Sequence, residues 1–199
     1  MPDTDFSWER LKGLFALSHD GIEWQHDVDY SPACALEMAK LEAECGIRST
    51  YFFRPCSDEY NSFGPSVRKV IEGILTFGHL LGVHIDLGLP RDADVSDAVL
   101  KYECVKQWRL LGSVYQVSQR VSFHAPPSDV LGRPIPGYKS SHGPYWQDRW
   151  IGDSRGVWSE NPEERIAEGE PLRVNLHPEW HFWPQHLADE WREREALKP

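Results

Sequence analysis

The sequence has no cluster of lysine and arginine, no long apolar run and no closely spaced pair of cysteines. It has 31 Asp and Glu against 21 Lys and Arg, a formal net charge of −10, which disfavours nucleic acid and anionic membranes as partners. No window is long and apolar enough for a membrane span, and the N-terminus lacks the basic flank and apolar run of a secretory signal. We therefore expect a cytoplasmic protein.

The four cysteines show no Cys-x-x-Cys spacing, which is typical of reduced thiols rather than of a disulfide framework or a zinc cage. The sequence also contains neither an internal repeat nor a low-complexity tract. Its 199 residues are enough for one domain with a complete core, so we expect residues 1–199 to form a single domain.

Short apolar strands alternate with helical patterns along the chain, which predicts an α/β fold with a largely parallel sheet. The expected strands are 21–26, 49–53, 80–84, 117–123, 150–154 and 173–176. The expected helices are 32–46, 65–77, 95–111 and 184–198. Residues 125–147 are rich in Pro, Gly and Ser, and we expect them to form a long loop, which is usually a functional feature.

Asp27 and Asp29 directly follow the first expected strand. In an extended chain residues i and i+2 point to the same side, so the two carboxylates should lie together at the mouth of that strand. Two carboxylates this close repel each other unless a cation lies between them or one of them holds a proton. A bound metal would satisfy one carboxylate and leave the other free as a base.

Histidines follow three later strands, at His84, His124 and His177. In a parallel barrel the catalytic groups gather at the carboxyl ends of the strands. A single histidine in such a position would be read as structural, but three of them with a paired carboxylate indicate a site. Asp29, His84 and His124 supply the three ligands that a catalytic zinc typically takes, so a divalent metal, Zn²⁺ first, is the expected cofactor. Asp27 would then accept a proton from water and His177 would protonate the leaving group of an amide or ester.

Six segments, in their order and spacing, resemble the polysaccharide deacetylases, the NodB-homology carbohydrate esterases. They are 26–30 (HDVDY), 51–55 (YFFRP), 78–86 (GHLLGVHID), 122–127 (SFHAPP), 153–156 (DSRG) and 176–180 (LHPEW). The resemblance covers roughly residues 23–183 and is strongest to a branch found in bacterial O-antigen and surface-polysaccharide biosynthesis. It implies an irregular, incomplete (β/α) barrel and metal-dependent removal of acetyl groups from sugars. It also implies that Asp27 is the catalytic base, Asp29 and His84 are metal ligands, and His177 is the catalytic acid.

The chain departs from the family pattern in two places. The family's second metal histidine comes four residues after the first, where this sequence has Gly88. We expect His124 to replace it. The family's arginine that orients the base is also missing, because Ala125 stands beside His124; Arg155 and Arg54 are the two candidates to take over that role.

Other polar residues near the expected site have weaker assignments. Asp86 would fix the tautomer of a histidine ligand, the favoured reading, or act as a weak ligand or a turn residue. Asp153 would orient His177, contact the sugar or lie solvated in a loop. Asn61 is either a substrate contact or a turn residue. We expect His26 and His79 to be structural. Trp146, Trp150 and Trp180 flank the expected mouth, where an indole would stack on a pyranose ring or pack in the core.

The leading hypothesis is a metal-dependent hydrolase of linear amides that removes the acetyl group of an N-acetylated sugar, as a step in surface-polysaccharide biosynthesis. Its substrate would be a carbohydrate or a sugar precursor. Two alternatives stay open at this point. One is a catalytically impaired carbohydrate-binding or scaffold protein, suggested by Gly88 and Ala125. The other is a related amidohydrolase that acts on a non-sugar amide.

Overall fold

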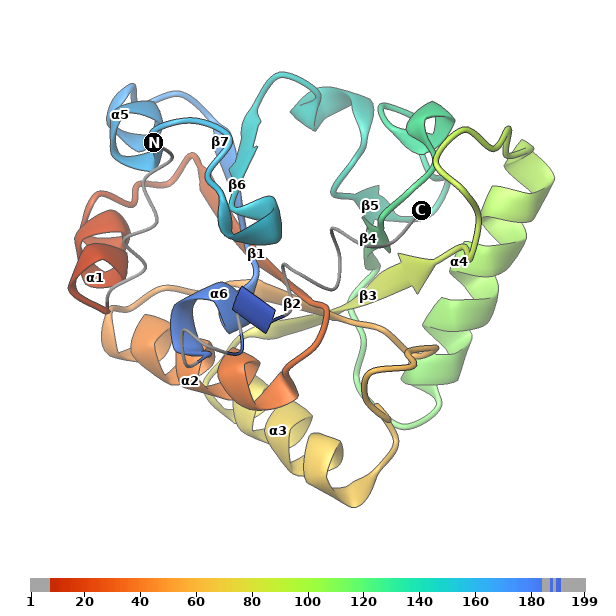
Figure 1. The fold of residues 1–199 in the computed structure, drawn as a ribbon, viewed down its shortest axis with the longest axis horizontal. Helices are drawn as coiled ribbons and strands as arrows, with labels where there is room; N and C mark the ends of the chain where they lie inside the picture. The colour runs from red at the N-terminus through yellow and green to blue at the C-terminus, as the bar shows by residue number, and fades with distance from the viewer. Residues whose placement is uncertain (1–7, 184–186, 188, 191–199) are drawn as a thin grey trace.

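A computed structural model describes residues 8–183, 187, 189 and 190 of the chain (Figure 1). The described residues form one sheet of seven strands in the order β5-β4-β3-β2-β1-β7-β6, and every neighbouring pair is parallel. The strands are β1 (Ile22–Val28), β2 (Thr50–Phe53), β3 (Leu80–Asp86), β4 (Arg120–His124), β5 (Lys139–Ser140), β6 (Trp150–Gly152) and β7 (Leu172–Leu176).

Helices cover the outside of this sheet (Figure 1). They are α1 (Trp8–Ala16), α2 (Pro32–Glu44), α3 (Pro65–Thr76), α4 (Asp97–Gly112), α5 (Pro162–Ala167) and α6 (Pro178–Phe182). The start of α2 follows from its sequence, because Ser31 accepts the Cys34 N–H at 3.3 Å and Pro32 occupies the first turn.

The strands curve into a half-barrel that stays open. The short strands β5 and β6 are the two ends of the strand order, and no pairing joins them among the described residues. This arrangement confirms the expected incomplete (β/α) barrel. It leaves the carboxyl ends of β1, β3, β4 and β7 around one shared space, which is where the predicted site residues lie.

The long loop expected at residues 125–147 is more structured than predicted. It contains β5 and the 3₁₀ turns η1 (Ser128–Val130) and η2 (Pro144–Trp146). A two-residue strand has no alternation to detect in the sequence, and it forms because Lys139 and Ser140 pair with the edge of β4. The strand expected at 117–123 begins only at Arg120. The helix expected at 184–198 falls largely outside the described residues.

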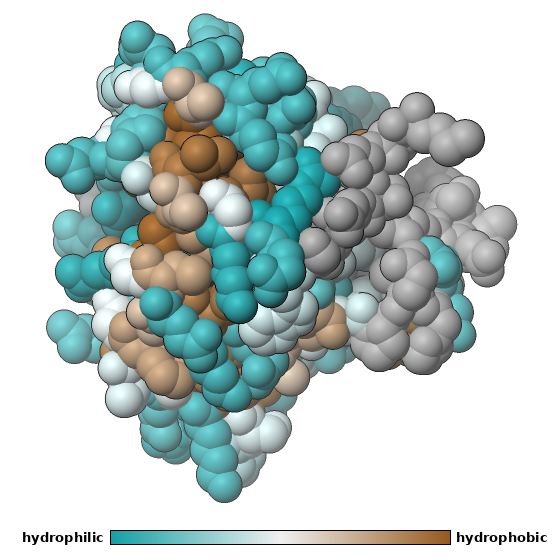
Figure 2. Space-filling view, turned by 90° about the vertical axis from the view of Figure 1, so that its left-hand side faces the viewer, coloured by the Kyte–Doolittle hydropathy of each residue, from teal (hydrophilic) through white to brown (hydrophobic). Residues whose placement is uncertain are grey.

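The helices α1, α5 and α6 were not expected from the sequence. On α1, the spacing of Leu11, Leu14 and Phe15 places three buried side chains on one face. The same side of the molecule shows a band of apolar side chains between hydrophilic margins (Figure 2). Within the described part of the chain, no helix combines the length and the apolar character that crossing a bilayer requires.

All four cysteines are free thiols, as the missing Cys-x-x-Cys spacing predicts. Cys34 and Cys104 are buried, whereas Cys45 and Cys56 are exposed. Burial raises the pKa of Cys34 to about 11 and that of Cys104 to about 12. Both buried thiols are therefore protonated and inert at neutral pH.

Candidate metal centre

Asp29, His84 and His124 converge at the carboxyl ends of β1, β3 and β4. Asp29 Oδ1 lies 3.0 Å from His84 Nε2 and 2.8 Å from His124 Nδ1. One donor atom from each of the three residues lies within 4.8 Å of the other two. Burial would raise the pKa of Asp29, but hydrogen bonds with His124 and His84 outweigh it and hold that pKa well below its usual range.

The chemistry of these three side chains fits a divalent ion. Two imidazole nitrogens and one carboxylate oxygen are typical zinc ligands, with bond lengths of about 2.0–2.2 Å. The donor atoms are close enough to share one ion at such distances. Ala125, directly after His124, has a φ of 39°, a left-handed conformation that costs an alanine about 1–2 kcal/mol. Local strain of this kind is common beside functional sites.

Asp27 lies beside this centre and keeps one oxygen uncommitted. Its Oδ2 accepts a hydrogen bond from Asn175 Nδ2 at 3.0 Å. Its Oδ1 is buried without a hydrogen-bond partner among the described residues, and it lies 3.5 Å from His84 Nδ1. Asp27 therefore combines a fixed orientation with a free acceptor, the two properties that a general base needs.

Asn175 is held in turn by a chain of buried side chains. Gln25 Nε2 donates to Asn175 Oδ1 at 3.1 Å, and Ser141 Oγ donates to Gln25 Oε1 at 2.8 Å. The parallel register of β1 and β7 places Gln25 directly beside Asn175. The sequence analysis did not identify Asn175. The sequence offers one indication of its role: Asn175 lies two residues before His177, so in an extended chain the two side chains point to the same side.

His177 faces the centre from the end of β7. Its Nε2 lies 3.7 Å from Asp29 Oδ2, and its Nδ1 lies 2.7 Å from Asp153 Oδ1. Burial alone would lower the pKa of His177, but the hydrogen bond and charge of Asp153, with the charges of Asp29 and Asp27, raise it to about 10. The imidazole is therefore protonated at neutral pH and able to donate a proton from Nε2.

Asp153 is completely buried and also binds a second histidine. His181 Nε2 donates to Asp153 Oδ2 at 2.8 Å, and the His177 backbone N–H donates to Oδ1 at 2.9 Å. Burial would raise the pKa of Asp153, but the hydrogen bonds from both histidines lower it. His181 therefore helps to keep Asp153 ionised.

The two arginines considered for orienting Asp27 lie elsewhere. Arg54 donates to Asp86 Oδ2 at 2.6 Å and to the Asp29 carbonyl oxygen at 3.5 Å. Arg155 is exposed, and no contact among the described residues joins it to Asp27. Asn175 occupies the position on Asp27 that an arginine was expected to take.

Asp86 caps a turn beside the centre rather than holding a histidine. Its Oδ1 accepts the Gly88 N–H at 2.8 Å, and Oδ2 accepts from Arg54. Gly88 has a φ of 61°, so the position of the family's missing histidine is a left-handed turn. Asn61 is likewise a turn residue, because its Oδ1 accepts the Phe63 N–H at 3.0 Å.

His26 and His79 lie in a buried cluster on the other face of β1, around the fully buried carboxylate of Glu42. His26 Nε2 lies 2.7 Å from Glu42 Oε1. His79 Nε2 donates to the Ala39 carbonyl oxygen at 2.9 Å, and its Nδ1 lies 3.7 Å from Glu42 Oε2. Both histidines therefore pack and hydrogen-bond within the core between α2 and the sheet.

Two buried groups near the centre were not anticipated. Burial lowers the pKa of His142 to about 4, although the charge of Asp27 opposes this, so the imidazole is neutral at pH 7. Glu179 is fully buried, and neither carboxylate oxygen has a hydrogen-bond partner among the described residues. Burial and the charge of Asp29 raise the pKa of Glu179 well above its usual value.

The three tryptophans lie away from the metal centre or are packed. Trp146 borders a cavity at the amino ends of the strands, and Trp150 begins β6 at that same end. Trp180 is 5% exposed and packs with Tyr30 and Trp183. The stacking role considered for these indoles at the mouth is therefore wrong for Trp146 and Trp150, because both lie at the amino ends of the strands, the opposite edge of the barrel from the metal centre.

Comparison with known proteins finds solved structures of similar fold but no similar sequence. No protein-family model and no curated protein sequence matches the chain. The structure is similar to the chitin deacetylase from the fungal pathogen Colletotrichum lindemuthianum, with a TM-score of 0.50, 14% identity, and coverage of 87% of this chain and 81% of that one. It also matches a peptidoglycan N-acetylglucosamine deacetylase with a TM-score of 0.38, 14% identity, and coverage of 77% of this chain and 55% of that one. The first of these likenesses shows a shared fold.

Proposed function

We propose that this protein is a metal-dependent hydrolase that removes the acetyl group from an N-acetylated sugar, with precursors of a surface polysaccharide as its substrate class. One observation carries the proposal: a single oxygen of Asp29 lies within 3.0 Å of two imidazoles, with Asp27 and His177 on either side. The similarity of the fold to a chitin deacetylase supports the choice of an acetylated sugar.

Asp29, His84 and His124 would hold the ion, and zinc is the metal that this donor set favours. A divalent ion held there would act as a Lewis acid on the acetyl carbonyl and would lower the pKa of water to about 7. Asn61 and Arg155 have no part in this assignment.

Asp27 is the general base in this proposal. Its free Oδ1 accepts a proton from the attacking water, while Asn175 holds Oδ2 and so fixes the direction of the carboxylate. The water oxygen bonds to the acetyl carbon, and the bond from that carbon to the sugar nitrogen breaks.

His177 is the general acid. Its Nδ1 is held by Asp153, so Nε2 faces the centre and donates its proton to the departing nitrogen. The sugar leaves as an amine and the acetyl group leaves as acetate. The surroundings of the two side chains assign the base and acid roles. Asp27 is a carboxylate with a free oxygen that can accept a proton, and His177 is a cation, stabilised by Asp153, that can donate one.

Elemental analysis and acetate release from purified protein test the proposal together. The substrate panel holds N-acetylglucosamine, its uridine diphosphate ester, chitin oligosaccharides and small linear amides. Asp27→Asn and His177→Ala should keep stoichiometric metal and lose roughly 10²–10⁴-fold in turnover, which is the usual contribution of a general acid or base. Asp58→Asn, on an exposed loop, is the matched control and should change neither quantity.

His124→Ala should lose both metal and activity. Stoichiometric metal in that variant would remove His124 from the ligand set. Turnover of small amides but of no sugar would contradict the substrate class and favour the non-sugar amidohydrolase. A protein that takes up no metal and releases no acetate would favour a carbohydrate-binding or scaffold role.

A further inference from the structure

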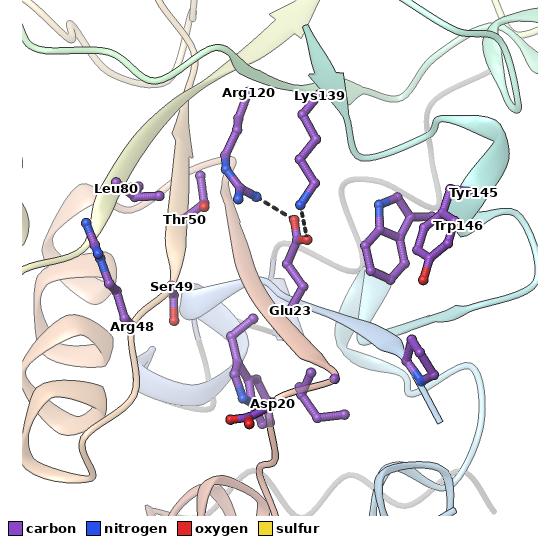
Figure 3. Close-up of a pocket in the computed structure, with 14 residues that line it drawn as sticks. Asp20, Glu23, Arg48, Ser49, Thr50, Leu80, Arg120, Lys139, Tyr145 and Trp146 are labelled. Carbon is purple, nitrogen blue, oxygen red and sulfur yellow. Dashed lines mark hydrogen bonds and ion pairs between the residues drawn. The ribbon is translucent and has the colours of Figure 1, made fainter. Parts of the chain in front are cut away.

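A cavity of about 630 Å³ opens at the amino ends of the strands, at the opposite edge of the sheet from the metal centre. Thr50, Leu80 and Arg120, the first residues of β2, β3 and β4, border it (Figure 3). Cavities of about 300–1,000 Å³ are the usual size for small-molecule sites. The proposed deacetylase mechanism uses no residue of this cavity.

Three cations surround one carboxylate on the wall of this cavity. Glu23 Oε1 accepts from Arg120 at 2.5 Å and from Arg173 at 3.1 Å, and Lys139 donates to Oε2. Figure 3 shows Arg120 and Lys139 reaching Glu23 from the same side. A single carboxylate cannot balance three cations, so this wall of the cavity is positively charged.

The wider lining keeps this excess of positive charge. Arg48 adds a cation and Asp20 adds a carboxylate, so the lining has three cations against two carboxylates. The buried Arg173 behind Glu23 brings the excess to two positive charges. Such an excess is unusual in a chain whose formal net charge is −10. The side chains of Lys139 and Arg120 are 47% and 24% exposed, so a ligand in the cavity can reach N–H groups that Glu23 does not occupy.

Aromatic rings form the wall next to these cations. Tyr145 and Trp146 lie beside Lys139, and their ring centroids are 4.7 Å apart (Figure 3). The guanidinium of Arg173 lies 4.2 Å from the Trp146 ring, which holds the indole in place. Tyr145 is 55% exposed and so presents a ring that a ligand can contact.

We propose that this cavity binds a small phosphate monoester that carries a ring, with the phosphate on Arg120 and Lys139 and the ring against Tyr145. A phosphate monoester carries a charge of about −1.5 to −2 at pH 7, which matches the excess of two positive charges. Arginine and lysine donate to phosphate oxygens through charge-assisted hydrogen bonds. An exposed aromatic ring beside a fixed cation suits the apolar face of a sugar or a base.

Isothermal titration calorimetry with glucose 6-phosphate tests this proposal on the full chain. We expect binding with one ligand per chain, and we expect glucose without the phosphate to show none at the same concentrations. Lys139→Gln and Arg120→Gln should each weaken the binding by about tenfold or more. Lys139 is half exposed, so its variant should keep the fold even if Arg120→Gln is unstable. Lys69→Gln, on the exposed face of α3, is the charge-matched control and should bind normally.

An Asp29→Asn variant separates this cavity from the metal centre. It should bind glucose 6-phosphate as the unaltered protein does, while losing metal. The Trp146 indole N–H resonance, assigned by its loss in Trp146→Phe, should shift on addition of the ligand. Three results would each overturn the proposal. The first is no binding at 10 mM ligand, about the concentration at which a millimolar site saturates. The others are equal binding of glucose, and binding that is lost in Asp29→Asn but kept in Lys139→Gln.

Discussion

Asn175 donates a hydrogen bond of 3.0 Å to Asp27, and this contact joins β7 to β1 directly beside the candidate metal centre. Asn175 therefore contacts Asp27, the proposed base, where the family resemblance implies an arginine. A neutral amide orients a carboxylate without adding a positive charge beside it. The base therefore keeps its direction, and the protonated His177 serves the proposed reaction as the acid.

Asn175→Leu should reduce turnover by roughly 10–100-fold, the usual effect of removing a partner that orients a site residue. Leucine has nearly the same shape as asparagine but cannot donate the hydrogen bond to Asp27, so the carboxylate can rotate away from the attacking water. Metal content should stay stoichiometric, because Asn175 does not contact Asp29, His84 or His124. Kinetic assays and elemental analysis on the same preparation measure both. Unchanged turnover would show that Asp27 needs no such support.

Asp153→Asn should lower the pKa of His177 from about 10 towards its ordinary value of 6.5. The raised pKa depends on the hydrogen bond and charge of Asp153, which outweigh the effect of burial. In metal-free protein the resulting stabilisation is complete below pH 6.5 and is lost as the pH rises towards about 10. Titration of the His177 imidazole by NMR and urea unfolding across this range should show both effects.

His181→Gln is the matched variant for Asp153→Asn. It removes one of the two histidines that bond to Asp153 but keeps the hydrogen bond between Asp153 and His177. Its effect on the pKa of His177 should be smaller than that of Asp153→Asn. Equal pKa values in the two variants would contradict the assignment of the raised pKa to the Asp153 charge.

Glu179→Gln should make metal-free protein more stable at pH 8 than the unaltered chain. Burial without a hydrogen-bond partner among the described residues, together with the charge of Asp29, raises the pKa of Glu179 in the folded protein well above 4.5, so it holds its proton to higher pH than the unfolded chain does. The unfolded chain releases that proton above about pH 4.5, so the unaltered protein loses stability as the pH rises, by about 1.4 kcal/mol for each pKa unit of difference. The neutral amide removes this dependence. Glu59→Gln, on an exposed loop, should leave the curve of unfolding free energy against pH unchanged.

Glu42→Gln should destabilise the fold by about 3 kcal/mol, because it removes a buried charge from partners that remain. Glu42 accepts from His26 at 2.7 Å, from Tyr51 at 2.6 Å and from Ser49. Burial would raise the pKa of Glu42, but the charge and hydrogen bond of His26 and the hydroxyl donors lower it. The stabilisation is therefore present above pH 4.5 and is lost as the pH falls below it. The difference in unfolding free energy between the variant and the unaltered protein should be full at pH 7 and smaller at pH 4. Glu44→Gln, exposed on the same helix, should match the unaltered protein at both pH values.

The sequence by itself determined the order of β1, β2, β3, β4, β6 and β7 and of the helices α2, α3 and α4 between them, but not β5, α1, α5 or α6. Asp27, on β1, and Asp29, just past its end, point to the same side because residues of an extended chain alternate, and His26 therefore faces Glu42 on the other side. The cap at Ser31, the end of β4 at His124 and the end of β7 just before His177 were also predictable from local patterns, whereas β3 runs two residues past His84 to Asp86.

Only the tertiary structure decided which of these residues meet. Asn175 reaches Asp27 across 148 residues of sequence, and Asp153 joins His177 to His181, because parallel pairing brings β7 between β1 and β6. Strand order and register depend on packing between distant segments, and local sequence does not encode them. For the same reason the charged cavity around Glu23 has no signal in the sequence, since its cations come from three different strands.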